Sequence, residues 1–112
     1  MSAPRLNRLL VLEGATRSAD GAGGFSESWA ALGELWAEVS ARTGRERAGA
    51  GVLVSSVSYR IVVRAAPVGA ASRPRPEQRF RDGTRLYVIQ AVAEHDPDGR
   101  FLTCFADEEV AA

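Results

Sequence analysis

The chain has 112 residues, of which 46% are hydrophobic, 25% charged and 7% aromatic, a composition typical of one soluble globular domain with a thin core. Its 14 cations, all arginine, balance 14 acids, so the net charge is zero and lysine chemistry such as a Walker A loop or a Schiff base is excluded. One histidine and one cysteine cannot supply a closed zinc site of the usual kind, and we expect no enzyme, no metal and no cofactor.

The N-terminal third of the chain predicts a β-hairpin. Residues 6–12 are mainly apolar and end at Gly14, which favours a strand that residues 16–18 extend. Residues 20–24 (Asp-Gly-Ala-Gly-Gly) indicate a turn, because glycine accepts the positive φ that hairpin turns require. Residues 28–42 fit both helical spacing and strand alternation. Gly33 and the preceding turn favour a returning strand over 35–41.

The middle of the chain predicts one strand and one long loop. Residues 45–55 are rich in alanine and contain two glycines, which is compatible with one short helix or a turn. Residues 57–64 alternate between apolar and polar side chains and predict a strand. Residues 65–77 contain Pro67, Pro74 and Pro76, so we expect a long loop there, and loops of that length are usually functional or disordered.

The C-terminal third predicts two hairpins. Residues 78–81 form a short strand before an Asp82-Gly83 turn, and an apolar strand follows over 86–92. Residues 95–99 (His-Asp-Pro-Asp-Gly) form a tight turn before a strand over 101–106, and residues 107–112 form an exposed acidic tail. We therefore predict an all-β fold, a small antiparallel barrel or sandwich of five to six or more short strands with at most one short helix and one long Pro/Arg loop, in a single domain over 1–112.

Export and membrane insertion are not expected. The apolar runs 9–12 and 61–63 are far shorter than the roughly 20 residues of a membrane span. Arg5 and Arg8 precede four apolar residues, too few for a secretory signal. The single cysteine, Cys104, suits a reducing compartment.

The zero net charge hides an uneven distribution. Residues 42–85 carry ten arginines against Glu46, Glu77 and Asp82, a balance of +7, whereas residues 86–112 carry one arginine against six acids, a balance of −5. The chain therefore has a basic middle and an acidic end.

Five of these arginines, the arginine set, fall within thirteen residues: Arg73, Arg75, Arg79, Arg81 and Arg85. They form either a solvated face or a contact with phosphates, because guanidinium groups pair well with phosphate oxygens. The aromatic ladder of a single-strand binder is missing, since only Phe80 and Tyr87 lie nearby in sequence.

Other candidate sites have plain structural explanations. Trp29 and Trp36 fit the core, although either can anchor a neighbouring subunit in a chain so poor in aromatics. The glycines at 21, 23 and 24 lack the spacing of a phosphate-binding loop. His95 beside Asp96 is typical of a solvated turn, and Cys104 beside Phe105 is typical of an inert buried thiol.

Taken in order, these features resemble the phage head-tail joining proteins over residues 6–104. The resemblance is carried by Arg5-Leu6-Asn7-Arg8-Leu9, the 20–24 turn, Leu35-Trp36-Ala37-Glu38-Val39 with Gly44, Tyr59-Arg60-Ile61-Val62-Val63-Arg64, Arg79-Phe80-Arg81-Asp82-Gly83, Leu86-Tyr87-Val88-Ile89 and Leu102-Thr103-Cys104. The alanine-rich stretch 65–72 departs from the family, where this segment is more polar.

The resemblance implies a β-barrel subunit made in the bacterial cytoplasm and built into the virion neck of a tailed phage, prophage or gene transfer agent, as a head-closure (stopper) protein or a head-tail adaptor. Its expected partners are its own copies in a ring, typically of six, the portal-side adaptor, the tail terminator or tail tube, and the packaged double-stranded DNA in the channel. In such a ring we expect the basic middle, with Arg73, Arg75, Arg79, Arg81 and Arg85, to face the DNA or the acidic segment of a neighbouring subunit, because complementary patches set register. The alternatives are a tail-terminator ring subunit and a small monomeric nucleic-acid-binding barrel.

Overall fold

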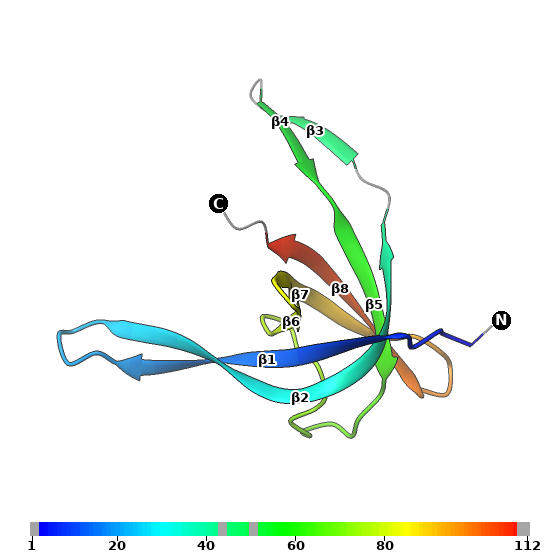
Figure 1. The fold of residues 1–112 in the computed structure, drawn as a ribbon, viewed down its shortest axis with the longest axis horizontal. Helices are drawn as coiled ribbons and strands as arrows, with labels where there is room; N and C mark the ends of the chain where they lie inside the picture. The colour runs from blue at the N-terminus through cyan, green and yellow to red at the C-terminus, as the bar shows by residue number, and fades with distance from the viewer. Residues whose placement is uncertain (1–2, 43–44, 50–51, 110–112) are drawn as a thin grey trace.

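The computed structural model describes residues 3–42, 45–49 and 52–109, with the backbone alone for 45–49 and 52–56. Within these residues the chain forms eight strands and no helix, so none of the described segments is a helix that could span a membrane. The strands are β1 (Arg8–Ala19), β2 (Phe25–Ala41), β3 (Arg45–Gly49), β4 (Val52–Ser56), β5 (Ser58–Arg64), β6 (Arg79–Asp82), β7 (Arg85–Glu94) and β8 (Phe101–Glu109) (Figure 1).

Six strands form one antiparallel sheet that closes on itself in the order β1-β2-β5-β8-β7-β6. The closing contact is the short pairing of β6 with β1, in which Leu12 lies opposite Phe80. The strands β3 and β4 form a separate two-stranded sheet. The predicted all-β fold class is confirmed.

The core fills the interior of the closed sheet and follows from strand alternation, because every second side chain points to the same face. In β5, for example, Ile61 and Val63 belong to the interior cluster and are fully buried, whereas Arg60 before them and Arg64 after them are exposed. Val62, which lies between Ile61 and Val63, is also buried but is not part of the interior cluster. The inward residues form one cluster, made of Leu10, Leu12, Ala37, Ile61, Val63, Phe80, Tyr87, Ile89, Leu102, Cys104 and Ala106.

The distal part of the β1–β2 hairpin, residues 14–31, leaves the closed sheet and is called the arm here (Figure 1). It begins at a bulge between Leu12 and Glu13, and bulges increase the local twist and bend a strand away from its sheet. The chain exposes 7736 Å², whereas a compact monomer of this length exposes about 6,000 Å². Its radius of gyration is 15.8 Å, compared with about 13 Å for a compact domain.

The tip of the arm is a defined turn at the predicted glycine-rich position. Gly21 and Gly23 adopt φ values of 80° and 83°, the left-handed region that glycine tolerates. The backbone N–H groups of Ala22 and Gly24 donate to Oδ1 of Asp20 at 2.8 and 3.0 Å, and these bonds lower the pKa of the Asp20 carboxyl.

Two sequence predictions are corrected by the strands. The strand expected over 35–41 is confirmed but starts at Phe25, because it pairs with β1 along the whole arm. The short helix or turn expected over 45–55 is wrong, since 45–49 and 52–56 pair as antiparallel strands. Glycines disfavour a helix in that segment, and Val52 and Val54 favour a strand.

The first half of the acidic segment 107–112 is part of the sheet and not a tail beyond it. Residues 107–109 belong to β8, where Asp107 lies opposite both Ser58 of β5 and Val88 of β7. Backbone pairing on both sides draws the acidic end of the chain into the sheet. Residues 110–112 lie outside the described residues.

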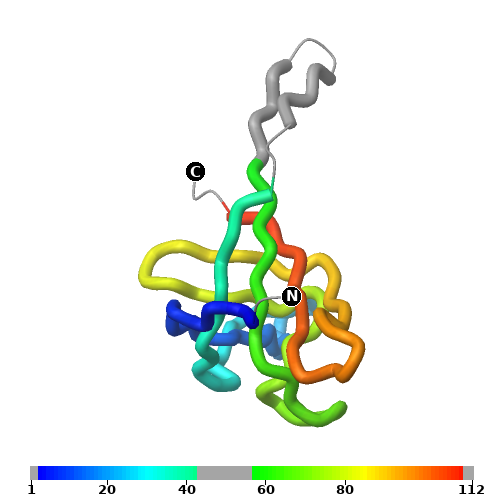
Figure 2. The backbone as a smooth tube through the Cα atoms, turned by 90° about the vertical axis from the view of Figure 1, so that its right-hand side faces the viewer, coloured from blue at the N-terminus to red at the C-terminus, as the bar shows by residue number. Residues whose placement is uncertain are grey.

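The predicted proline-containing loop is confirmed, and its backbone is organised by hydrogen bonds. The N–H of Ala70 donates to Pro67 O and that of Arg73 to Ala70 O, both at 3.0 Å. The N–H of Glu77 donates to Ile89 O of β7 at 2.9 Å, which fixes the end of the loop against the sheet. Figure 2 shows this loop at the end of the closed sheet where β5 ends.

Candidate functional site

The arginine set does not form one surface. Three of its members, Arg79, Arg81 and Arg85, pair with acids of the same chain, whereas Arg73 and Arg75 lie in the loop. The five side chains that are clustered in sequence therefore lie in three different places in the fold.

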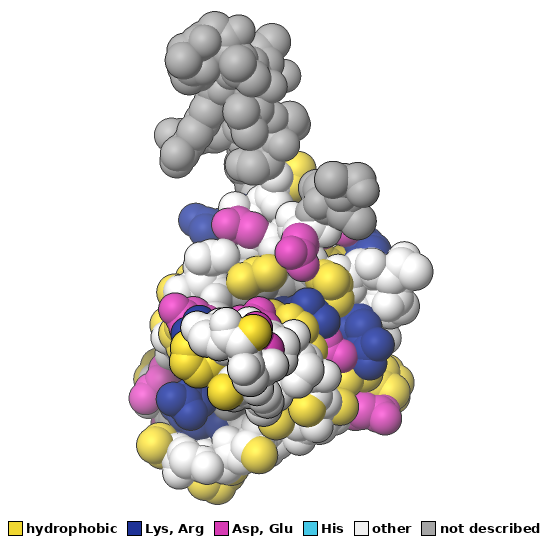
Figure 3. Space-filling view, turned by 90° about the vertical axis from the view of Figure 1, so that its left-hand side faces the viewer, with side chains coloured by type: hydrophobic (Ala, Val, Ile, Leu, Met, Phe, Trp, Pro, Cys, Tyr) yellow, Lys and Arg dark blue, Asp and Glu magenta, His cyan; other side chains and the backbone are white. Residues whose placement is uncertain are grey.

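Arg79 and Arg81 share one buried carboxylate. Nε of Arg79 donates to Oε1 of Glu13 at 2.8 Å, and Nη2 of Arg81 lies 3.0 Å from Oε2. Glu13 is only 4% exposed, and the ring of Trp29 covers Arg79 with Cζ 3.9 Å from its centroid. Because Glu13 follows the bulge and Trp29 comes from the arm, this cluster fixes the base of the arm to β6. Figure 3 looks along the arm and shows cationic and acidic side chains adjoining around its base.

Arg85 is held by the acidic end of β8. Its Nε donates to Oε2 of Glu108 at 2.9 Å, and its Nη2 donates to Oε1 of Glu108 at 3.1 Å and to the Tyr59 hydroxyl at 3.0 Å. This hydrogen bonding raises the pKa of Arg85 and lowers that of Glu108. The partner of Arg85 is therefore a carboxylate of the segment that had been expected to be a free tail.

A second ion pair lies at the same end of the closed sheet. Arg8 of β1 pairs with Asp82 of β6, and both residues alternate in phase with the inward core positions of their strands. Beneath them Tyr87 is fully buried, its ring 5.0 Å from that of Tyr59, and its hydroxyl has no hydrogen-bond partner among the described residues. Burial raises the pKa of Tyr87. Two balanced ion pairs thus close this end of the apolar core.

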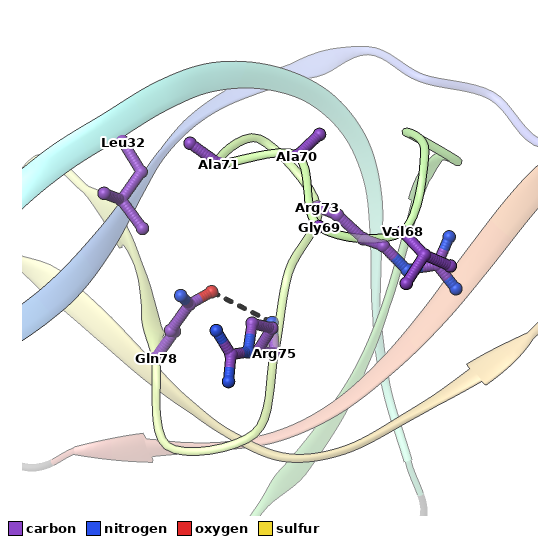
Figure 4. A pocket seen from close by; sticks show the side chains of 8 residues that line it. All are labelled: Leu32, Val68, Gly69, Ala70, Ala71, Arg73, Arg75 and Gln78. Atoms are coloured by element: carbon purple, nitrogen blue, oxygen red, sulfur yellow. Dashed lines mark hydrogen bonds between the residues drawn. The ribbon is translucent and has the colours of Figure 1, made fainter.

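Arg73 and Arg75 line a cavity of about 500 Å³ between the loop and the base of the arm. Nη1 of Arg73 donates to Ala66 O at 2.7 Å, and the backbone N–H of Arg75 donates to Oε1 of Gln78 at 2.9 Å. The other lining residues are mostly apolar: Leu32, Val68, Gly69, Ala70 and Ala71, with Gln78. In Figure 4, Leu32 and Ala71 lie on one side of the opening, and Arg75 and Gln78 lie on the other.

The two tryptophans lie outside the core cluster, so the interpretation of both as core residues is wrong. Leu35, Ala37 and Val39 face the interior, and strand alternation therefore turns Trp36 outward. Trp36 is 56% exposed and lies opposite Leu9, which is 44% exposed. Trp29 is half-buried against Arg79, so Trp36 is the freer of the two for contact with another molecule.

A basic surface that the sequence prediction missed lies on the outer side of β5 and β8, which Figure 2 shows side by side. Arg60 lies opposite Phe105, and its guanidinium Cζ is 5.9 Å from the centroid of that ring. Arg64 lies opposite Phe101, and its Cζ is 5.8 Å from that ring centroid. Arg42, which follows β2, has its guanidinium Cζ 5.2 Å from the centroid of the Phe105 ring. We call these five residues the basic face.

The three arginines of the basic face are exposed, and none of them takes part in an ion pair among the described residues. A signal for it was present, because Arg60 and Arg64 occupy the same phase of the alternating strand. Their separation in sequence from the arginine set concealed it. The clustered arginines are largely neutralised, whereas the dispersed ones keep their charge.

The remaining reactive groups have structural roles. The thiol of Cys104 is fully buried, and burial raises its pKa to about 12, as expected of an inert cysteine. The predicted solvated turn is wrong in detail, since Nδ1 of His95 lies 2.9 Å from Oγ1 of Thr103 and Oδ1 of Asp96 accepts the Phe101 N–H at 2.9 Å. Among the described residues no cluster of His, Cys, Asp or Glu is arranged to hold a metal ion.

Comparisons with known proteins agree on one kind of molecule. The model of the phage head completion protein family matches residues 1–109. A solved chain from the "Virion of native gene transfer agent (GTA) particle" is 65% identical, with a TM-score of 0.83, over 98% of this chain and 100% of that chain. The search of curated proteins gives no match.

Proposed function

Because the chain belongs to the phage head completion protein family, we propose that it is a structural, non-enzymatic subunit of a virion neck. Its copies form a ring, of six in the expected arrangement, between the portal-side adaptor and the tail terminator or tail tube. The observation that carries this proposal is the end-to-end similarity, at 65% identity, to a chain of a gene transfer agent virion.

The shape of the chain supports assembly with other copies. The arm projects from the closed sheet, and the exposed area of the chain is well above that of a compact monomer. Trp36 and Leu9 add a pair of exposed apolar side chains on the part of β1 and β2 that belongs to the closed sheet. Burying this exposed apolar area against a neighbouring subunit would stabilise the assembly. Tryptophan is also a frequent anchor residue in interfaces.

The distribution of charge supports a ring around DNA and refines which residues face it. Arg79, Arg81 and Arg85 are occupied by acids of the same chain, so we assign phosphate contact to the basic face instead. Arg42, Arg60 and Arg64 are exposed beside aromatic rings, and guanidinium groups there can meet a DNA backbone without reading bases.

Electron microscopy of the intact particle tests the proposal. We expect a closed ring of this chain at the interface between head and tail, with residues 58–64 and 101–105 lining its channel. Complete necks that lack this chain would overturn the proposal. A ring in contact with the tail tube but not with the portal-side complex would instead identify a tail-terminator subunit.

A further inference from the structure

The arm carries a bulky apolar side chain at its tip. Phe25 is 66% exposed, although it lies in a regular strand pairing opposite Ala19. The guanidinium Cζ of Arg17 lies 5.3 Å from its ring centroid and supports the ring from one side. The tip turn is fixed by two hydrogen bonds to Asp20, so the ring is presented on an ordered hairpin.

The same chain contains a cavity of matching character. The cavity of about 500 Å³ beside the loop has an apolar side with Leu32, Ala70 and Ala71 and a polar side with Arg75 and Gln78 (Figure 4). An aromatic ring placed there would pack against the apolar side. It would also lie against the Arg75 guanidinium, for which the described residues supply no ion-pair or hydrogen-bond partner.

A chain cannot fill its own cavity with its own arm. The cavity includes Leu32, which lies at the base of the arm, whereas Phe25 lies at its tip. Residues 14–19 of β1 are extended and span roughly 20 Å at the rise of a β-strand. Since the arm is a paired hairpin anchored by the Glu13 cluster, its tip points away from the loop of the same molecule (Figure 1).

Ring symmetry favours a second copy as the occupant. Contacts around a ring are heterologous, so each copy must offer two different and complementary surfaces. The arm and the loop meet this requirement, and their charges are opposite in sign. The arm has Asp20 and Glu27 against one arginine, and the loop has Arg73 and Arg75 against one acid.

We propose that the arm of each copy inserts Phe25 into the loop cavity of the next copy around the ring. This inference rests on the proposed ring, and it names the surfaces that join its subunits. It assigns Arg75 and Arg73 to the contact between subunits and leaves the basic face for DNA. Arg75 recognises Phe25 through its guanidinium and the acidic arm through its charge.

Thiol cross-linking in assembled particles tests this contact. Copies carrying both Ser26→Cys, which leaves Phe25 in place, and Ala70→Cys are incorporated into particles and treated with a short bismaleimide. We expect a ladder of covalent multimers of this chain that ends at the ring number. The buried thiol of Cys104 should not react, so the single variants should remain monomeric on a denaturing gel.

The matched control pairs Ser26→Cys with Ala93→Cys, which is exposed on β7 away from the cavity and should give no ladder. Phe25→Ser should reduce incorporation into particles by at least about tenfold while Phe25→Leu retains it, because an interface anchor depends on its apolar bulk. A ring without a ladder, or a cross-link from residue 26 to a different protein, would overturn the contact and leave the proposed function intact. Particles without a ring of this chain would overturn both.

Discussion

At the scale of single residues, Glu13 shows how the fold uses charge. A carboxylate that is 4% exposed is costly to bury alone, and Arg79 and Arg81 offset that cost by binding both of its oxygens. The cluster then holds Trp29 and the base of the arm in place. Two arginines that look like a nucleic-acid contact in the sequence are thus part of the structural framework.

We expect Glu13→Gln to lower the free energy of unfolding by about 1–3 kcal/mol, because it leaves two guanidinium groups without their shared carboxylate. Urea denaturation followed by tryptophan fluorescence measures the change. Glu27→Gln, an exposed position on the arm, is the control and should change stability by less than about 0.5 kcal/mol. Equal effects of the two variants would contradict the structural role of Glu13.

Cys104 makes stability depend on pH in the alkaline range. Its pKa is raised to about 12 in the folded chain, and the unfolded chain loses this proton near pH 9. The contribution of the protonated thiol to the free energy of unfolding is therefore fully present below about pH 9. It is lost as the pH rises from about 9 toward 12, by at most about 1.4 kcal/mol per pH unit. Urea denaturation at several pH values should give Cys104→Ala a shallower decline above pH 9 than the wild-type chain. Parallel declines would show that the thiol does not contribute.

At the scale of elements, the end of β8 completes the closed sheet. Residues 107–109 pair with β7, and residue 107 pairs also with β5. Glu108 binds Arg85 and the Tyr59 hydroxyl across the end of the core. The acidic character of this segment therefore balances a cation of the neighbouring strand inside one subunit. It is not wholly available to a neighbour, as a free tail would be.

We expect Glu108→Gln to destabilise the chain at pH 7 and to make its stability less sensitive to acid. The Arg85 hydrogen bonds lower the pKa of Glu108, so its contribution is present above the unfolded value near pH 4.3 and is lost as the pH falls through the lower folded value. Thermal denaturation of the two proteins should differ at pH 7 and converge below about pH 4. Glu109→Gln, exposed on the same strand, should show no such convergence.

At the scale of the whole molecule, the +7 balance of the middle segment is divided by the fold. Part of it is neutralised within the subunit, part lines the loop cavity, and part remains on the basic face. The zero net charge of the chain is thus the sum of the charges of several surfaces, each with its own role. A freely acting monomeric DNA binder would keep most of its cations on one continuous surface.

We expect the isolated chain to bind duplex DNA weakly, with a shallow dependence of the binding constant on salt, because few phosphates can be contacted at once. Arg60→Ala with Arg64→Ala should lower DNA retention in assembled particles while ring assembly persists. Arg79→Ala with Arg81→Ala should instead lower stability. Fluorescence anisotropy across a salt series and DNA release from particles measure these effects. Tight, steeply salt-dependent binding by the monomer would favour the monomeric nucleic-acid-binding alternative.

The sequence by itself determined the all-β class, the main turns and the long loop. These features depend on only a few neighbouring residues: the period-two alternation of strands, the φ preferences of glycine, and the backbone N–H donor that proline lacks. A short stretch of sequence is therefore enough to predict them. Only the tertiary structure decided which arginines keep their charge, since Arg79 meets Glu13 across 66 residues of chain and Arg85 meets Glu108 across 23. Strand order and register, with a bulge after Leu12, bring those charges together, and no local pattern specifies such pairings.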